Sequence, residues 1–199
     1  MILVFGETGQ VATELQRTGD VVAVGRDFAN LSNPLPCYEA IKIREPKAVI
    51  NAAAYTNVDK AESEEELATT INGNSPKAMA KACATLNIPL VHLSTDYVFD
   101  GTGDEPWHPK DATKPQNAYG RTKKIGEESI RSIASNYCIL RTSWVVSSHG
   151  TNFVKTMLNL SENRDTLSLI ADQIGGPTPA KDIAKACLKI IAQLKEEPN

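Results

Sequence analysis

The chain has 199 residues, of which 41% are hydrophobic and 23% charged, and its formal net charge is −3. A charge this close to neutral argues against nucleic acid and against an anionic membrane surface as partners, and no apolar run reaches the length that spans a bilayer. The length suits one domain with a sizeable buried core, or slightly more.

The predicted elements alternate between strands and helices along the chain. Short aliphatic or β-branched runs predict strands at 1–5, 21–24, 47–51, 89–93, 137–141 and 166–170. Helical patterns fill the gaps at 9–18, 35–44, 64–86 with a break near Gly73, 117–134, 152–163 and 179–195. This order predicts an α/β fold, a doubly wound parallel sheet with helices on both faces. A ligand of such a sheet lies beyond the carboxyl ends of the strands.

A glycine motif follows the first predicted strand. Gly6 permits a tight turn, Gly9 lets the backbone approach a pyrophosphate, and the small Ala12 lets helix and strand pack closely. An ordinary strand–turn–helix connection is the alternative. The strand-to-helix context favours a dinucleotide site, and the G-x-x-G-x-x-A spacing suggests the short-chain dehydrogenase variant of the Rossmann fold.

Tyr119 and Lys123 are four residues apart on a predicted helix, so their side chains project from one face. A free phenol has a pKa near ~10, and an ammonium beside it would lower that pKa. Tyr119 would then become a usable proton donor or acceptor. One exposed helix turn is the alternative interpretation of the same spacing.

The remaining reactive side chains indicate no metal. The three histidines lack metal-ligand spacing, and the acidic run at 62–66 is typical of a solvated helix face. The four cysteines are scattered without a C-x-x-C pair, which is typical of a reduced, cytoplasmic protein.

Seven motifs together are similar to one known family. They are VFGETGQV at 4–11, NAAAYTNVDKAE at 51–62, STDYVFDG at 94–101, YGRTK at 119–123, RTSWV at 141–145, NFVKTML at 152–158 and DQIGGPT at 172–178. The chain resembles the dTDP-4-dehydrorhamnose reductase family of the extended short-chain dehydrogenases/reductases, from residue 1 to about residue 185.

The resemblance implies NAD(P)H-dependent reduction of the C4 ketone of dTDP-4-dehydro-L-rhamnose to dTDP-L-rhamnose, for cell-surface polysaccharide synthesis. It implies that Tyr119 gives its proton to the C4 oxygen, that Lys123 holds the nicotinamide ribose, and that Thr95 completes a catalytic triad. The implied cofactor-binding residues are Gly6, Gly9, Gln10, Val11, Arg26, Asn30, Leu31, Ala53, Ala54, Thr56, Tyr119 and Lys123. The implied substrate-binding residues are Thr95, Asp96, Tyr97 and Trp144. A turn cap at Asp96 and a core position for Trp144 are the alternatives.

The end of the second strand bears on the choice of dinucleotide. NAD-preferring members carry an acidic residue there, whereas this chain has Gly25 and Arg26. Gly25 leaves room for a 2′-phosphate, and Arg26 can offer it a planar charged fork. NADP(H) is therefore favoured, with NAD(H) possible. In the competing interpretation Asp27 binds the ribose.

The family continues beyond the position of Asn199, so we expect an incomplete substrate domain. The expected division is an NAD(P)-binding domain at 1–170 and the start of a substrate-binding region at 171–199. We expect this length of chain to bind the dinucleotide and to reduce the sugar poorly or not at all. Some relatives dimerise through a metal held by glutamates; Glu14 matches one position, but Lys181 replaces the second glutamate. We expect no such metal and a possible homodimer.

Two other functions stay open at this point. Related enzymes dehydrate, reduce or epimerise other nucleotide sugars, but a 4,6-dehydratase carries Glu where this chain has Tyr97, so dehydration is disfavoured. The regulatory subunit of methionine adenosyltransferase also resembles this family and acts by binding a partner without catalysis. Turnover of the dTDP-sugar with NADPH would distinguish an enzyme from such a binding protein.

Overall fold

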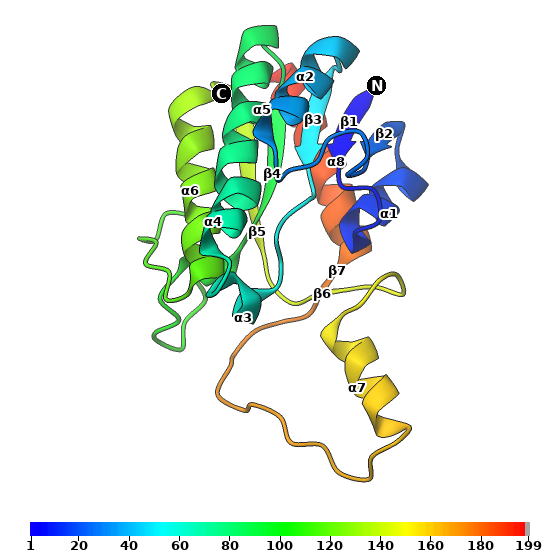
Figure 1. Cartoon of the computed structure of the whole chain (residues 1–199), viewed down its shortest axis with the longest axis vertical. Coiled ribbons are helices and arrows are strands. Elements are labelled where there is room, and N and C mark those ends of the chain that lie inside the picture. Colours follow the sequence, from blue (N-terminus) through cyan, green and yellow to red (C-terminus); the bar gives the residue numbers. More distant parts are fainter. Residues whose placement is uncertain (198–199) are drawn as a thin grey trace.

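The computed structural model describes residues 1–197. Its centre is a five-stranded parallel sheet in the order β2-β1-β3-β4-β5 (Figure 1). The strands are β1 (Ile2–Phe5), β2 (Val21–Val24), β3 (Ala48–Asn51), β4 (Leu90–Thr95) and β5 (Tyr137–Thr142). Because β2 and β3 lie on opposite sides of β1, the strand order reverses there, and this opens a crevice at the carboxyl ends of the strands. The predicted α/β, Rossmann-type fold class is confirmed.

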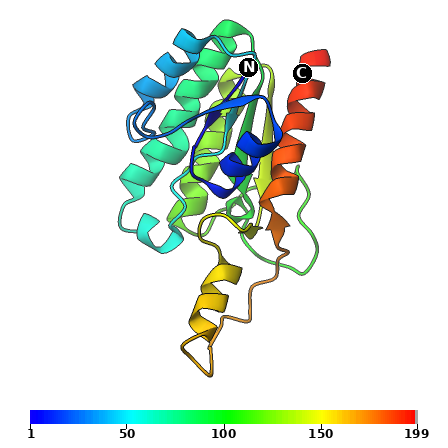
Figure 2. The ribbon, with the colours of Figure 1, turned by 90° about the vertical axis from the view of Figure 1, so that its right-hand side faces the viewer.

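Helices cover both faces of the sheet, as Figure 2 shows from the side. On one face lie α2 (Pro34–Arg44), α5 (Ser75–Leu86) and α6 (Ala118–Ile133), whose buried side chains form one core cluster with β1, β3 and β4. On the other face lie α1 (Gln10–Thr18) and α8 (Ala180–Glu196). The central strands are apolar on both sides because both faces are covered; all of β3 is buried.

Helix α8 follows the predicted domain boundary at residue 170 and packs beside α1 on the same sheet. Its buried stripe consists of Ile183, Ala184, Cys187, Ile191 and Leu194. This is the amphipathic pattern that the sequence predicted for the last helix. The boundary at 170 as a division of function stays a prediction.

The predicted helix 64–86 contains the break expected near Gly73. Helix α4 (Glu65–Thr69) passes through a π-helical turn (Thr70–Asn74) into α5, and a short α3 (Val58–Ala61) precedes it. Gly126 of α6 packs against this turn so closely that an added Cβ would clash with the Asn72 carbonyl. The turn therefore brings Asn72 into the core, where its amide bonds Tyr55 and Thr122.

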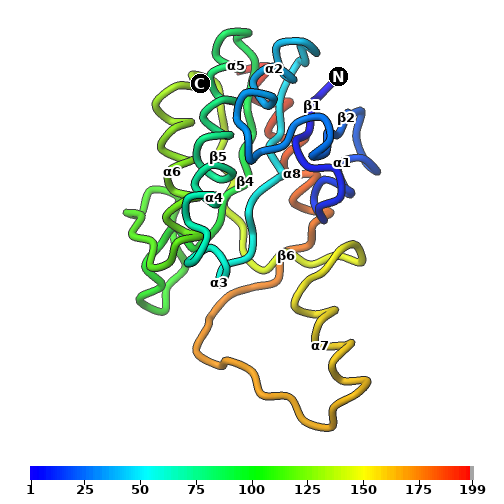
Figure 3. Tube along the Cα trace, in the orientation of Figure 1, coloured from blue at the N-terminus to red at the C-terminus, as the bar shows by residue number. Residues whose placement is uncertain are grey.

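The predicted sixth strand at 166–170 is wrong. This run has no regular structure, and Leu169 and Ile170 are 55% and 75% exposed. The run lies in the long segment after α7 (Phe153–Ser161), away from the sheet edge that could pair with it (Figures 1 and 3). Instead, β6 (Val145–Val146) pairs in parallel with β7 (Thr178–Pro179). Within residues 1–197 no helix is long and apolar enough to cross a bilayer.

A buried carboxylate joins α6 to β4 and β5. Glu127 is fully buried and accepts two hydrogen bonds from Arg141, at 2.9 and 2.7 Å, one from Ser94 at 2.6 Å, and one from Arg131 at 3.1 Å. Burial alone would raise the pKa of Glu127, but Arg141 and Ser94 outweigh it and the pKa is lowered. This network fixes the helix that carries Tyr119 and Lys123 against the sheet.

Candidate active site

A cavity of about 210 Å³ opens at the carboxyl ends of β4 and β5. It brings together six of the residues that the sequence nominated, from four separate segments of the chain: Thr56, Thr95, Asp96, Tyr97, Tyr119 and Trp144. Convergence of these segments follows from the parallel sheet, since all of its strands end at the same edge.

The glycine turn after β1 has the geometry that the sequence suggested. Gly6 has a φ of 104°, and a Cβ there would lie 3.3 Å from the backbone of Ala52. Its amide donates to the Val24 carbonyl, which links the turn to the end of β2. Gly9 then caps the N-terminus of α1. A strand, a left-handed glycine and a helix N-terminus form a backbone cradle suited to phosphate.

Thr95, Asp96 and Tyr97 leave β4 in a short 3-10 turn that Thr95 caps. The Thr95 hydroxyl accepts from the Tyr97 amide at 3.2 Å and donates to Asp96 Oδ1 at 3.0 Å. Burial raises the pKa of Asp96, although these hydrogen bonds oppose it. The Tyr97 ring meets Tyr119 edge-on, with centroids 5.7 Å apart. The turn thus places a hydroxyl, a carboxylate and a phenol around one cavity.

Tyr119 lies in the first turn of α6, and polar side chains fix this end of the helix. Asn117 accepts from the Gly120 amide at 2.8 Å, and Glu62 accepts from the Ala118 amide at 2.6 Å. Burial raises the pKa of Tyr119 to about 12, Thr95 lowers it, and Asp96 and Tyr97 raise it. The phenol is therefore protonated at neutral pH, in the state that donates a proton.

Lys123 is not among the groups that shift the pKa of Tyr119 in this structure, and its effect on the phenol stays a prediction. Lys123 is only 2% exposed, and its Nζ donates to the Leu93 carbonyl at 2.6 Å and lies 3.3 Å from His92 Nε2. The amine is thus committed to β4 and is not the group that lowers the Tyr119 pKa. Burial also lowers the pKa of Lys123 to about 8, although Glu127 opposes the shift.

Other predicted cofactor residues follow the carboxyl ends of β1 and β3. Ala53, after β3, donates its amide to Asn51 Oδ1 at 3.1 Å. Gln10, the first residue of α1, uses its side chain to bond Val145, Ser147 and Asn152. The other members of this set are half-buried Ala54, exposed Thr56 and buried Val11.

Three predicted cofactor residues follow β2. Arg26 and Asn30 are exposed, whereas Leu31 packs in the core and its carbonyl accepts from Ser75. Glu7 was not among the predicted cofactor-binding residues. Its carboxylate lies over Gly25, where an added Cβ would clash with it. An acidic group is therefore present at the end of β2, supplied by the glycine turn.

Trp144 lies after β5 and is 41% exposed. Its φ of 45° is in the left-handed region, which a bulky side chain rarely occupies. The indole lies against Gly175, where an added Cβ would come within 3.0 Å of the ring. Its exposed ring does not match the alternative of a core position. Strain of this kind clusters at functional sites.

Sequence reasoning missed the polar residues that support this site. The acidic run, interpreted as a solvated face, makes specific contacts: Glu64 accepts from the Tyr55 hydroxyl at 2.7 Å, and Glu65 binds Arg121 at 2.8 Å. His92 also gave no local signal, because its partners Asn51 and Lys123 come from other elements.

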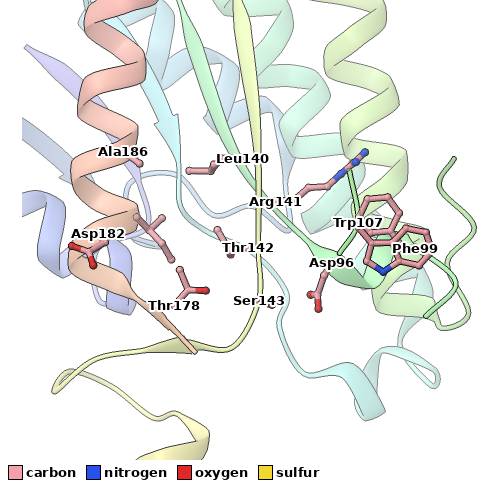
Figure 4. Close-up of a pocket in the computed structure, with 11 residues that line it drawn as sticks. Asp96, Phe99, Trp107, Leu140, Arg141, Thr142, Ser143, Thr178, Asp182 and Ala186 are labelled. Atoms are coloured by element: carbon pink, nitrogen blue, oxygen red, sulfur yellow. The ribbon is translucent and has the colours of Figure 1, made fainter. Parts of the chain in front are cut away.

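A second cavity of about 410 Å³ shares Asp96 with the first and lies along the free edge of β5 (Figure 4). Phe99 stacks on Trp107 with ring centroids 4.6 Å apart, and Arg141 lies 4.8 Å from the Phe99 ring centroid. Asp182 and Ile183 of α8 form the opposite wall. The two cavities share Asp96, Thr142 and Ser143 as lining residues.

Known proteins resemble this chain over its whole length. A family model described as "RmlD substrate binding domain" matches residues 1–199. A dTDP-4-dehydrorhamnose reductase of Salmonella typhimurium is 46% identical over 206 residues, covering 100% of this chain and 69% of the relative. The crystal structure of a dTDP-4-dehydrorhamnose reductase from Clostridium acetobutylicum has a TM-score of 0.92 and 38% identity, covering 98% of this chain and 71% of that one. The enzyme from Bacillus anthracis, solved in complex with NADP, has a TM-score of 0.92 and 34% identity, covering 96% of this chain and 70% of that one.

Proposed function

The chain belongs to the RmlD substrate binding domain family, and we propose on that premise that it is an NADP(H)-dependent dTDP-4-dehydrorhamnose reductase. The reaction is reduction of the C4 ketone of dTDP-4-dehydro-L-rhamnose to the alcohol of dTDP-L-rhamnose. The observation that carries the proposal is the cavity in which Thr95 and Tyr119 meet Asp96, Tyr97 and Trp144. The names of the relatives support this reaction and give no support to a non-catalytic regulatory role.

The residues present fit a dinucleotide. Gly6 leaves space at the turn where a Cβ would press on the Ala52 backbone, and Gly9 opens the helix N-terminus toward a pyrophosphate. Ala53, Ala54 and Thr56 would line the nicotinamide side. When bound there, NADPH supplies the hydride that reaches C4.

The protein's own part in the reaction is proton delivery and orientation. Tyr119, protonated at neutral pH, would donate its proton to the C4 oxygen as the negative charge develops there. The Thr95 hydroxyl, which already lowers the Tyr119 pKa, would bond the phenol and the substrate oxygen. Lys123 would leave its bonds on β4 to hold the ribose, and its charge beside the phenol would then assist proton transfer.

Substrate contacts are proposed on the far side of the cavity. Asp96 and Tyr97 would bind sugar hydroxyls, and the exposed indole of Trp144 offers a flat apolar face to the ring. The test of the whole function is a pair of measurements on this chain, turnover of dTDP-4-dehydro-L-rhamnose with NADPH and binding of NADPH alone. Turnover, even if slow, would distinguish the reductase from a non-catalytic dinucleotide-binding protein, and failure to bind NADPH would contradict both.

Replacing Arg26 with Ala is expected to weaken NADPH binding roughly 5- to 100-fold, because one partly exposed arginine–phosphate contact contributes about 1–3 kcal/mol. NADH binding should change little, since NADH lacks the 2′-phosphate. The measurement is a pair of titrations, NADPH and NADH, on both proteins. Glu7→Gln should have the opposite effect and strengthen NADPH binding, because it removes the negative charge over Gly25 that would repel the 2′-phosphate.

The same titrations, extended to Asp27→Ala, test the competing role for Asp27. If Asp27 binds the ribose, Asp27→Ala weakens NADH binding while Arg26→Ala leaves the NADPH preference in place, and the assignment to Arg26 is then wrong.

A cytoplasmic location is proposed on the four free cysteines. Homodimer formation stays a prediction.

A further inference from the structure

His92 is a fully buried histidine on β4 with a partner at each ring nitrogen. Asn51 Nδ2, from β3, lies 3.1 Å from Nδ1, and Lys123 Nζ, from α6, lies 3.3 Å from Nε2. The ring therefore connects the strand that precedes the proposed nicotinamide segment with the lysine proposed to hold the ribose. Its pKa is lowered well below the ordinary value by burial and by Lys123, so the ring is neutral.

The orientation of the Asn51 amide is set independently of His92. Its Oδ1 accepts from the Ala53 amide at 3.1 Å, so its Nδ2 carries the two hydrogens that face His92. Nδ1 of His92 must then accept. A neutral imidazole has one N–H, which is therefore on Nε2 and points toward the Lys123 nitrogen.

The Nε2–H group needs an acceptor, and an ammonium has none. An uncharged amine has one lone pair for His92 and can still donate to the Leu93 carbonyl, so every group is satisfied. A charged Lys123 in the same place would force two donors against each other in a buried site, where an unmade hydrogen bond is costly.

We propose that His92 is a positioning residue for the reductase: with its tautomer set by Asn51, it stabilises the uncharged form of the Lys123 amine against β4, and Lys123 leaves β4 when the amine takes a proton from solvent. Burial lowers the Lys123 pKa to about 8, so the form held against β4 prevails above that pH and the released ammonium prevails below it. The released ammonium is the form that the ribose and the phenol of Tyr119 require. The inference rests on the proposed function only for the destination of Lys123. The hydrogen-bond assignment itself does not depend on the reaction.

The other charged groups around this pair have defined partners. Glu127, one turn after Lys123 on α6, acts on Lys123, and its carboxylate is held by Arg141 and Arg131. From β3 the facing group is the uncharged amide of Asn51. Among the described residues, Lys123 in its protonated form is the charged group that lowers the pKa of His92, so the protonation of Lys123 is the quantity to measure.

The first experiment uses the wild-type protein without cofactor or substrate. The ¹⁵N shifts of the His92 ring should show a neutral Nε2–H tautomer at neutral pH. An Nδ1–H tautomer, or a charged ring, overturns the proposal. Because neither NADPH nor sugar is present, this result is independent of whether the chain proves to be a reductase.

The second experiment follows the Lys123 Cε and Nζ resonances with pH in the wild type and in His92→Gln. The Gln amide can turn its oxygen toward Lys123 and accept from the ammonium, so the Lys123 pKa should rise by roughly one unit. His149→Gln, a change in the histidine that binds Glu14 away from Lys123, should leave it unchanged. A purely structural His92 predicts an unshifted Lys123 pKa, which would overturn the proposal. If His92→Gln does not fold, the tautomer of His92 in the wild-type protein still tests the proposal.

Discussion

Replacing Tyr119 with Phe is expected to lower kcat by roughly 10²–10⁴-fold, the usual contribution of a positioned general acid. The Kd for NADPH should stay within a factor of about 3, because only the hydroxyl is lost and a partly exposed neutral hydrogen bond contributes little. The measurement is steady-state reduction of the dTDP-sugar, with NADPH binding measured by titration. The expected signature is loss of kcat with binding retained.

The same substitution at Tyr38 is the matched control. Tyr38 lies on α2 and packs against the core cluster on the far side of α5 from the cavity. Tyr38→Phe should keep both kcat and NADPH binding. Undiminished turnover in Tyr119→Phe would remove the phenol from the mechanism, and another acid in the cavity, such as Asp96 with its raised pKa, would then be the candidate.

Replacing Lys123 with Met is expected to weaken NADPH binding by roughly 10- to 100-fold, because a hydrogen bond from a charged group contributes about 1.5–3 kcal/mol. Turnover should fall as well, since the charge that assists Tyr119 is also lost. Two opposed effects act on the free energy of unfolding. Loss of the partner of the Leu93 carbonyl and of His92 Nε2 lowers it, whereas loss of a charge that burial disfavours raises it. Burial lowers the Lys123 pKa to about 8, which means that folding disfavours its charge, and Met of similar length carries none.

The sign of this stability effect follows from the direction of the pKa. A lysine whose pKa is lower in the folded protein destabilises the fold at pH values below that pKa, where the unfolded chain holds the proton more tightly. Lys124→Met is the control on the same helix, since Lys124 is bound to Thr113 and Glu128 at the surface. A Lys123→Met protein that keeps its NADPH affinity would contradict the role proposed for this lysine.

The sequence predicted the sheet well because its strands are buried on both faces. The run at 21–24 coincides with β2, and Tyr119 and Lys123 lie on one helix as their spacing required. The aliphatic run at 166–170 failed because apolar character does not reveal whether a neighbouring strand is within reach. The two-residue strands β6 and β7 are too short for any periodic pattern.

The sequence predicted which residues form the site, but it did not predict the hydrogen bonds between them. Thr95, Tyr97 and Tyr119 line one cavity as expected. The partner of Lys123 is the backbone carbonyl of Leu93, and a backbone partner cannot be predicted from the types of the residues. Glu7 was missed because its effect depends on where a flexible side chain folds back over Gly25. Contacts of this kind become visible only when distant elements are placed in space.

The packing of α8 beside α1 has a consequence for how the molecule is made. Val11, Ala12 and Leu15 of α1 share one core cluster with Ile183 and Cys187 of α8, so part of one face of the sheet stays uncovered until α8 is synthesised. Contacts so far apart in sequence are slow to form, and until they do, apolar surface on β1, β3 and β4 faces solvent. The nascent chain therefore passes through a stage at which a chaperone, or another nascent chain, competes with α8 for that surface.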